Sequence, residues 1–317
     1  MNDELFMRRC IQLAANGIQG ARPNPMVGAV LVAPHVSSSD SPSFVIIGEG
    51  YHVRCGQGHA EVNAFASVRA EDEHLLKDAT LYVSLEPCSH YGKTPPCADL
   101  IIRKGVRRVV VGCVDPFAEV QGRGIQKLRD AGIDVTVGVL EEECRWLNRR
   151  FFTYHSKHRP YIILKWAQTA NGFMDDHGHA LQISNEHTQM LSHQLRAEED
   201  AILVGHTTDV REHPLLTVRH WHGPNPKRIV LTHDRPLPLL MDDLYQHGIQ
   251  SLIVEGGRLT HESFLAAGLW NEIRVETAPV TVSDGTPAPQ LPTSINIYNK
   301  VEWGGHTLLK CRKDNKC

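Results

Sequence analysis

Three residues of types that bind zinc occur together in the first third of the chain. His59 begins the tripeptide His-Ala-Glu, Cys88 follows a proline, and Cys97 follows a pair of prolines. One imidazole and two thiolates provide three protein ligands, which leaves a fourth position on the metal for water. This arrangement is typical of a catalytic zinc site, because structural sites are closed by four protein ligands.

Glu61 lies two residues after His59, where it can face a water on the metal without coordinating it. A carboxylate there can take a proton from the water and pass it to a departing amine, while zinc lowers the pKa of the water toward neutrality. His-x-Glu followed by Pro-Cys and a second cysteine is the signature of zinc deaminases acting on amino-pyrimidines and related rings. We therefore predict that His59, Cys88 and Cys97 bind Zn2+ and that Glu61 is catalytic.

Two other interpretations of these residues stay open. His90 is available as a fourth ligand, which would close the site and make it structural. The chain could also be a non-enzymatic zinc-binding interaction module, in which case Glu61→Gln would change no activity. The proline-flanked cysteines together with His-Ala-Glu favour the catalytic interpretation.

A deaminase of bases in RNA or DNA is a further alternative. Four basic residues cluster at positions 103–108, and a basic and aromatic stretch covers 145–159. Against it, Lys and Arg total 33 while Asp and Glu total 36, for a formal charge of −3, and nucleic-acid binding depends mainly on positive charge. We therefore expect a small-molecule substrate and no nucleic-acid partner.

Composition limits the class of protein. The 317 residues are enough for about two domains, and 41% apolar with 22% charged residues favour a folded chain. No apolar run reaches about eighteen residues, so we expect no transmembrane helix. The polar first residues do not resemble a signal peptide, which predicts a cytoplasmic protein whose eight cysteines are free or metal-bound.

Alternating strand and helix patterns predict two α/β domains, the first with a largely parallel sheet. In the first half we expect strands at 27–32, 44–48, 80–85, 106–113 and 133–139, and helices at 4–17, 59–69, 98–104 and 125–131. In the second half we expect strands at 161–166, 201–204, 228–231 and 251–255, and helices at 186–196 and 259–267. We place the domain boundary between residues 147 and 148.

Longer motifs identify a family. The relevant segments are 21–28 (Ala-Arg-Pro-Asn-Pro-Met-Val-Gly), 50–52 (Gly-Tyr-His), 59–61 and 84–97 (Ser-Leu-Glu-Pro-Cys-Ser-His-Tyr-Gly-Lys-Thr-Pro-Pro-Cys). They resemble the bifunctional deaminase/reductase family of riboflavin biosynthesis, to which the wide spacing of Cys88 and Cys97 is specific. The resemblance implies a cytidine-deaminase-like three-layer domain over 1–147 and a dihydrofolate-reductase-like α/β domain over 148–317.

The resemblance also implies the two reactions. The first is zinc-dependent hydrolytic deamination of 2,5-diamino-6-ribosylamino-4(3H)-pyrimidinone 5′-phosphate, and the second is NADPH-dependent reduction of the ribosyl group to ribityl. By position, five residues would line the deaminase pocket: Asn24, His52, His90, Lys93 and Thr94. Asn24 can both donate to and accept from a ring edge, and Lys93 suits a phosphate.

The second half carries a Gly-Gly pair at 256–257 after a strand, a turn that can bind phosphate, but no Gly-x-Gly-x-x-Gly fingerprint. Its motifs follow the order of the family's reductase domain, among them Lys-Trp-Ala at 165–167, Leu-Arg-Ala at 195–197 and Pro-Leu-Leu-Thr-Val-Arg at 214–219. The resemblance implies that NADPH is bound by Ala167, Gln182, Thr208, Glu212 and Gly257. It implies that the substrate contacts Lys165, Arg196, Leu216, Arg219 and Glu255.

Several positions depart from the family pattern. Asn171 replaces an Asp, Glu212-His213 replaces Asp followed by Asp or Asn, and Thr232 replaces another Asp. The stretch 231–251 is also shorter than usual, as though a strand and a loop were missing. The alternative is therefore a deaminase-only enzyme whose second domain has lost turnover and serves as an oligomerisation platform. The resemblance implies a homo-oligomer in either case.

Overall fold

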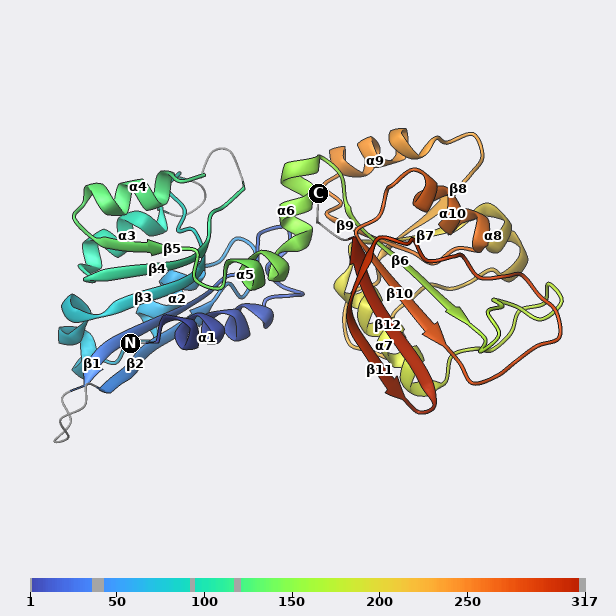
Figure 1. Ribbon diagram of the computed structural model, residues 1–317. Coiled ribbons are helices and arrows are strands. Elements are labelled where there is room, and N and C mark those ends of the chain that lie inside the picture. Colours follow the sequence, from blue (N-terminus) through green and yellow to red (C-terminus); the bar gives the residue numbers. More distant parts are fainter. Residues whose placement is uncertain (1, 36–42, 92–94, 117–120, 314–317) are drawn as a thin grey trace. The chain divides into compact units, whose positions relative to one another are not determined.

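The computed structural model describes residues 2–35, 43–91, 95–116 and 121–313, so the predicted pocket residues Lys93 and Thr94 lie outside the described residues. The chain divides into two compact units, Met1–Ser156 and Lys157–Cys317, each built on its own sheet (Figure 1). This division falls within a helix, later than the position 147/148 expected from the sequence.

The first unit has a five-stranded sheet in the order β2-β1-β3-β4-β5. The strands are β1 (Gly28–His35), β2 (Ser43–Tyr51), β3 (Thr80–Leu85), β4 (Arg108–Cys113) and β5 (Asp134–Val137). Strands β3, β4 and β5 pair in parallel, whereas β1 is antiparallel to both of its neighbours. The sheet is therefore parallel except for β1, and the carboxyl ends of β3, β4 and β5 lie along the same edge of the sheet.

Helices cover both faces of this sheet. On one face lie α2 (Ala60–Ala66), the 3₁₀ helix η1 (Ala70–Asp78), α3 (Cys97–Lys104) and α4 (Arg123–Asp130), which enclose a core that includes Leu31, Leu81 and Ile101. On the other lie α1 (Asp3–Ala15), α5 (Glu141–Leu147) and α6 (Arg149–Lys157), over a second core. The unit is a three-layer α/β domain, as predicted.

The basic and aromatic stretch 145–159 forms the end of α5 and all of α6. Phe151 and Phe152 are buried in the core of the first unit, and the guanidinium of Arg145 stacks 4.6 Å from the ring centre of Phe152. Because these aromatic side chains pack inward, the first compact unit extends to Ser156, beyond the boundary expected from the sequence.

The second unit has a seven-stranded sheet in the order β11-β12-β10-β6-β9-β7-β8. The strands are β6 (Tyr161–Gln168), β7 (Ala201–Gly205), β8 (Lys227–Leu231), β9 (Ser251–Val254), β10 (Glu272–Thr277), β11 (Ile295–Trp303) and β12 (His306–Lys313). The five strands from β10 to β8 are parallel, and the hairpin β11–β12 adds two antiparallel strands at the β10 edge.

Four helices accompany this sheet: α7 (Glu186–Glu198), α8 (His206–Glu212), α9 (Leu237–Gln246) and α10 (Arg258–Ala266). Leu195 of α7 packs on one face, and α9 and α10 pack on the other through Leu240 and Phe264. The short stretch 231–251 holds α9, which connects β8 to the parallel strand β9. In the part of the chain described, no helix combines the length and hydropathy needed to cross a lipid bilayer.

Candidate functional site

Two segments of the first unit bring the three predicted zinc ligands together. His59 is the residue before α2, and the Asn63 amide fixes that helix by donating to the carbonyl of Tyr51 at 2.8 Å. Cys88 lies in the loop that follows β3, and Cys97 is the first residue of α3. The ligands therefore stand at the starts of two helices and at the end of one strand.

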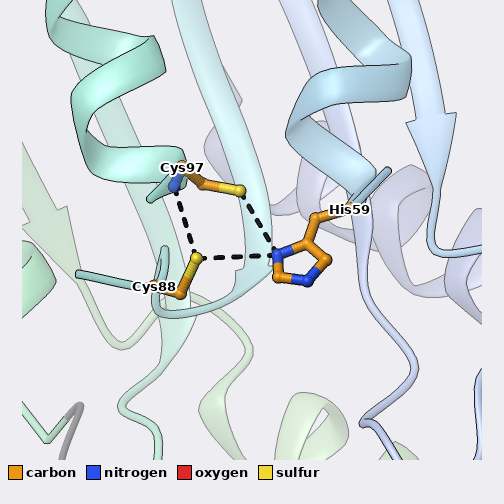
Figure 2. Close-up of side chains that lie close together, drawn as sticks. All are labelled: His59, Cys88 and Cys97. Atoms are coloured by element: carbon orange, nitrogen blue, oxygen red, sulfur yellow. Dashed lines mark hydrogen bonds between the residues drawn. The ribbon is translucent and has the colours of Figure 1, made fainter. Parts of the chain in front are cut away.

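The three ligand atoms lie within 4.8 Å of one another. His59 Nδ1 is 3.6 Å from Cys88 Sγ and 3.4 Å from Cys97 Sγ, and Figure 2 shows the imidazole and the two sulfurs turned toward one another. A tetrahedral zinc ion, with Zn–N of ~2.0–2.1 Å and Zn–S of ~2.3 Å, holds nitrogen and sulfur ~3.5 Å apart. The donor set and its spacing therefore fit zinc.

The backbone favours a thiolate at Cys88. The N–H of Cys97, at the N-terminal end of α3, donates to Cys88 Sγ at 3.3 Å (Figure 2). Hydrogen bonds from Cys97 and from His59 lower the pKa of Cys88 to about 4, and a helix N-terminus stabilises negative charge. The neighbouring Cys88 thiolate and burial in turn raise the pKa of Cys97, so binding a divalent cation releases a proton from this pair.

Glu61 is buried in the first turn of α2, with only 3% of its surface exposed. Burial raises the pKa of its carboxyl to about 7, and the charge of Cys88 adds to this rise. A hydrogen bond also joins Glu61 to Cys97. The carboxyl is thus held beside the ligand cluster with an affinity for protons that suits both accepting and donating them near neutral pH.

Among the described residues, no fourth protein ligand belongs to this cluster. Within the described ranges, the only group of three or more His, Cys, Asp or Glu side chains close enough to share a metal is His59, Cys88 and Cys97. His90, the alternative fourth ligand, is exposed and does not belong to that group. The described side chains therefore favour an open zinc site over a closed one.

Asn24 and His52 lie next to the ligand cluster. The His52 ring meets the His59 ring edge-on, with ring centres 5.2 Å apart. Burial lowers the pKa of His52, and its Nδ1 donates to the carbonyl of Gly58 at 3.2 Å. Its Nε2 then accepts from Asn24 Nδ2 at 3.2 Å, which orients the amide oxygen of Asn24 away from the ring.

Asn148 supports Asn24 from a distant part of the sequence. Its side chain accepts from the N–H of Met26 and donates to the carbonyl of Met26, both at 2.8 Å. This pair of bonds spans 122 positions and fixes the segment that carries Asn24. Asn148 was not predicted from the sequence, because its only signal was a single polar residue within an aromatic stretch.

In the second unit, Arg196 and Glu255 form a nearly buried ion pair. Arg196 Nη2 lies 2.6 Å from Glu255 Oε2, and Arg196 Nε donates to Glu255 Oε1 at 3.3 Å. Their side chains are 11% and 10% exposed. Burial alone would raise the pKa of Glu255, but the charges of Lys165 and Arg196 outweigh it and hold this pKa below its ordinary value. Three of the predicted reductase substrate residues are thus brought together.

The predicted cofactor residues Thr208 and Gly257 also meet. Gly257 precedes α10, and a Cβ placed on it would lie 3.3 Å from Thr208 Oγ1. A Cβ on Gly256 would lie 2.7 Å from the Cβ of Thr260, so this position needs glycine. The turn before α10 is therefore tight and lined by backbone and hydroxyl groups, which fits a phosphate-bearing ligand such as NADPH.

The other predicted cofactor residues have different surroundings. Ala167 is half-buried in β6, Gln182 is exposed and donates to the carbonyl of Ser184 at 2.7 Å, and Glu212 is exposed at the end of α8. Glu212 pairs with the adjacent Arg211 at 2.6 Å. In the part of the chain described, no hydrogen bond or ion pair links these three residues to Gly257 or to Thr208.

The departure at Asn171 has a structural consequence. Its side chain accepts from the hydroxyl of Thr169 at 2.9 Å and donates to the carbonyl of Val282 at 2.7 Å. The second bond needs an amide N–H, which an Asp at this position lacks. Asn171 thus joins two loops of the second unit.

Leu216 and Arg219 lie on one loop beside the ion pair. Leu216 is buried and has φ of +52°, and the carbonyl of Thr217 accepts from Arg196 Nη1 at 3.2 Å. His193, which the sequence analysis did not select, is buried beneath this loop. The available signal was its position on α7, three residues before Arg196.

Comparison with known proteins gives a consistent result for both units. The family described as "Cytidine and deoxycytidylate deaminase zinc-binding region" matches residues 1–113. The family described as "RibD C-terminal domain" matches residues 160–242 and 235–312.

Two curated relatives match along most of the chain. The riboflavin biosynthesis protein RibD of Aquifex aeolicus is 38% identical over 328 residues, covering 89% of this chain and 88% of that protein. RibD of Bacillus amyloliquefaciens is 33% identical over 338 residues, covering 91% and 87%.

A solved structure matches both units together. It is a diaminohydroxyphosphoribosylaminopyrimidine deaminase/5-amino-6-(5-phosphoribosylamino)uracil reductase from Thermotoga maritima. The TM-score is 0.86 at 32% sequence identity, over 98% of this chain and 99% of that one.

Proposed function

The chain belongs to the RibD family of bifunctional deaminase/reductases in riboflavin biosynthesis, and we propose that its first unit deaminates a phosphoribosyl-pyrimidine and its second unit reduces the product. The first substrate is 2,5-diamino-6-ribosylamino-4(3H)-pyrimidinone 5′-phosphate. The second reaction converts the ribosyl group to ribityl. Both units have the folds that these activities require, a zinc-binding deaminase domain and a dihydrofolate-reductase-like domain.

One observation carries the deaminase proposal: His59 Nδ1 and the sulfurs of Cys88 and Cys97 lie at the spacing of three zinc ligands, with Glu61 buried beside them. We propose that these three residues hold the metal. When bound, zinc supplies a Lewis acid that brings the pKa of a water to about 7.

Glu61 moves the proton in this proposal. Hydrolytic deamination adds water to a ring carbon and expels ammonia. One proton of the water ends on a ring nitrogen, and the other must travel from the water oxygen to the amine nitrogen. The Glu61 carboxyl, buried beside the proposed metal ligands, binds that proton and releases it within the same pocket. Asn24 and His52 orient the pyrimidine edge, and His90, Lys93 and Thr94 complete the pocket by family resemblance.

In the second unit we propose that NADPH is held by Ala167, Gln182, Thr208, Glu212 and Gly257. When bound, NADPH supplies a hydride for reduction of the ribosyl group. The tight turn before α10 supports this proposal. Lys165, Arg196 and Glu255 contact the substrate from β6, α7 and the end of β9, while Leu216 and Arg219 contact it from their loop. The two guanidinium groups suit a phosphate or a ring carbonyl.

We also propose a homo-oligomer in the cytoplasm. The location is supported by the cysteines, because none of those in the described residues forms a disulfide, as a reducing compartment favours. Sedimentation of the purified chain would give its assembly state.

The test is to follow both reactions on one preparation. The purified protein is given the diamino substrate with NADPH, and released ammonia and loss of NADPH absorbance are recorded together. We expect ammonia to appear first and NADPH oxidation to follow.

Ammonia release without NADPH oxidation would replace this proposal with the deaminase-only alternative, in which the departures at Asn171, Glu212-His213 and Thr232 have cost the second unit its turnover. Absence of ammonia release would reject the first half of the proposal. NADPH oxidation from separately prepared deaminated substrate would then still support the second half.

A further inference from the structure

His193 is a buried histidine at the edge of the proposed reductase substrate site. It lies on α7 three residues before Arg196, so both side chains project from the same side of the helix. Only 3% of its surface is exposed. Arg196, Arg219, His220 and Glu255 are all close enough to influence its charge.

The ring of His193 binds backbone of the loop that carries two proposed substrate residues. Its Nδ1 accepts the N–H of Arg219 at 2.7 Å and lies 3.4 Å from the N–H of His220. A ring nitrogen that accepts a hydrogen bond carries no proton, so the proton of the neutral ring is on Nε2. Burial and the positive charges of Arg196 and Arg219 lower the pKa of His193 to about 4, which keeps the ring neutral in ordinary buffers.

The same loop is held at neighbouring backbone groups. Arg196 Nη1 donates to the carbonyl of Thr217 at 3.2 Å, and the N–H of Val218 donates to Asn225 Oδ1 at 2.7 Å. Leu216 has φ of +52° and is buried. A non-glycine residue in this conformation persists only where its surroundings hold it. The loop thus contains a residue in an unfavourable backbone conformation, and several hydrogen bonds hold the loop in place.

Arg219 is the residue whose placement depends most on this anchor. Its side chain is exposed, and its Nη1 donates to Thr217 Oγ1 at 3.1 Å. Its backbone N–H makes the shorter of the two bonds to His193. His193 therefore fixes the backbone from which the Arg219 side chain starts, whereas the guanidinium at the other end of that side chain is exposed to solvent.

We infer that His193 is a positioning residue for the reductase: by binding the backbone of Arg219 it holds the Arg219 guanidinium where an anionic substrate meets it, beside Arg196. This inference rests on the proposed function of the second unit. His193 itself touches no reacting atom.

The test compares His193→Asn with His193→Leu in the full-length protein. The Asn side chain can place an oxygen where Nδ1 stands and accept the same N–H, whereas Leu fills the space without an acceptor. We expect His193→Leu to raise KM for the deaminated substrate about tenfold or more, because the part-buried N–H of Arg219 loses its acceptor, with kcat and KM for NADPH changed less than about threefold. We expect His193→Asn to stay within about threefold of wild type throughout.

His187→Leu is the matched control, since His187 is an exposed histidine on the same helix. It should leave all three kinetic constants unchanged. If His193→Leu lowers kcat and raises both KM values by similar factors, and His193→Asn does not restore them, His193 has a general structural role and the inference is overturned.

A double variant tests whether His193 acts through Arg219. If it does, adding His193→Leu to Arg219→Leu raises KM for the substrate no further than Arg219→Leu alone. If the increases in KM from the two single substitutions multiply in the double variant, the two residues act independently, which also overturns the inference.

Amide hydrogen exchange separates this inference from the proposed function. We expect the N–H groups of Arg219 and His220 to exchange about tenfold faster in His193→Leu than in wild type and His193→Asn. Unchanged exchange would reject the anchor even if the reductase is active. A wild-type protein that never oxidises NADPH would reject the reductase and the positioning role together, while faster exchange would still identify the anchor.

Discussion

Glu86 and Gly124 lie 38 positions apart in the sequence, yet Glu86 Oε1 accepts the Gly124 N–H at 2.9 Å. The same carboxylate accepts the N–H groups of Ile125 and Asp115, each at 3.3 Å, and of Gly122 at 2.9 Å. The buried side chain that stands two residues before Cys88 thus binds the start of α4. A Cβ on Gly124 would collide with the carbonyl of Pro87, so only glycine allows this approach.

This relationship predicts the effect of Glu86→Gln. The amide keeps one acceptor oxygen but turns an NH2 group toward backbone N–H groups, so we expect the first unit to lose about 2–3 kcal/mol of stability. Thermal unfolding should shift to lower temperature, and zinc should dissociate more readily. Glu142→Gln, at an exposed position, is the control. Unfolding and zinc retention equal to wild type would contradict the role given to Glu86.

Removal of a thiolate should separate the two activities. We expect Cys88→Ser and Cys97→Ser each to lose zinc and ammonia release, because a hydroxyl is a poor replacement for a thiolate ligand. Reduction of the deaminated substrate by NADPH should persist, since the second unit is a compact fold of its own. Cys55→Ser, a half-buried cysteine outside the cluster, should change neither. Full zinc content in either ligand variant would show that the assignment is wrong.

The ligand cluster was predictable because its signals are local. His59, Cys88 and Cys97 each sit beside residues that define a helix start or a strand end, and Figure 2 shows the three side chains converging as the motif requires. The fold class was likewise predictable from alternating strand and helix patterns, and the comparisons confirm it.

Other features depend on contacts between distant segments. The hydrogen bonds between Asn148 and Met26 cannot be recognised from the sequence around either residue. The same is true of the hydrogen bond between His193 and the backbone of Arg219. Strands β10, β11 and β12 were not predicted, and many of the side chains in β11 are exposed, so its burial pattern lacks the regular alternation that would mark a strand. Helix α6 was not predicted, because the stretch 145–159 was described only as basic and aromatic, and its basic residues concealed the buried Phe151 and Phe152.

The pair Arg196–Glu255 predicts a pH-dependent stability. The pKa of Glu255 is lower in the folded protein than its ordinary value near 4.5, so the folded state favours the ionised carboxylate. The pair therefore stabilises the second unit fully above about pH 4.5, and this contribution is lost as the pH falls below that value through the folded pKa.

Glu255→Gln tests that prediction. At pH 7 it leaves Arg196 nearly buried without its partner charge, which should cost about 3 kcal/mol; the difference from wild type should shrink as the pH falls below 4.5. Urea unfolding followed by tryptophan fluorescence reports mainly on the second unit, which contains Trp166, Trp221, Trp270 and Trp303. Glu262→Gln, in the exposed pair with Arg258, is the control. If the difference in unfolding free energy between Glu255→Gln and wild type is the same at pH 7 as below pH 4.5, this account of the pair is refuted.

Glu61→Gln examines the central claim most directly, because it alters the proposed proton carrier and leaves the three proposed metal ligands in place. The measurement is zinc per chain together with ammonia released from the diamino substrate, in wild type and in the variant. The account predicts one zinc per chain in both proteins, and ammonia release that falls by a factor of about 10²–10⁴ in the variant. A variant that keeps its zinc and still releases ammonia at the wild-type rate would contradict it.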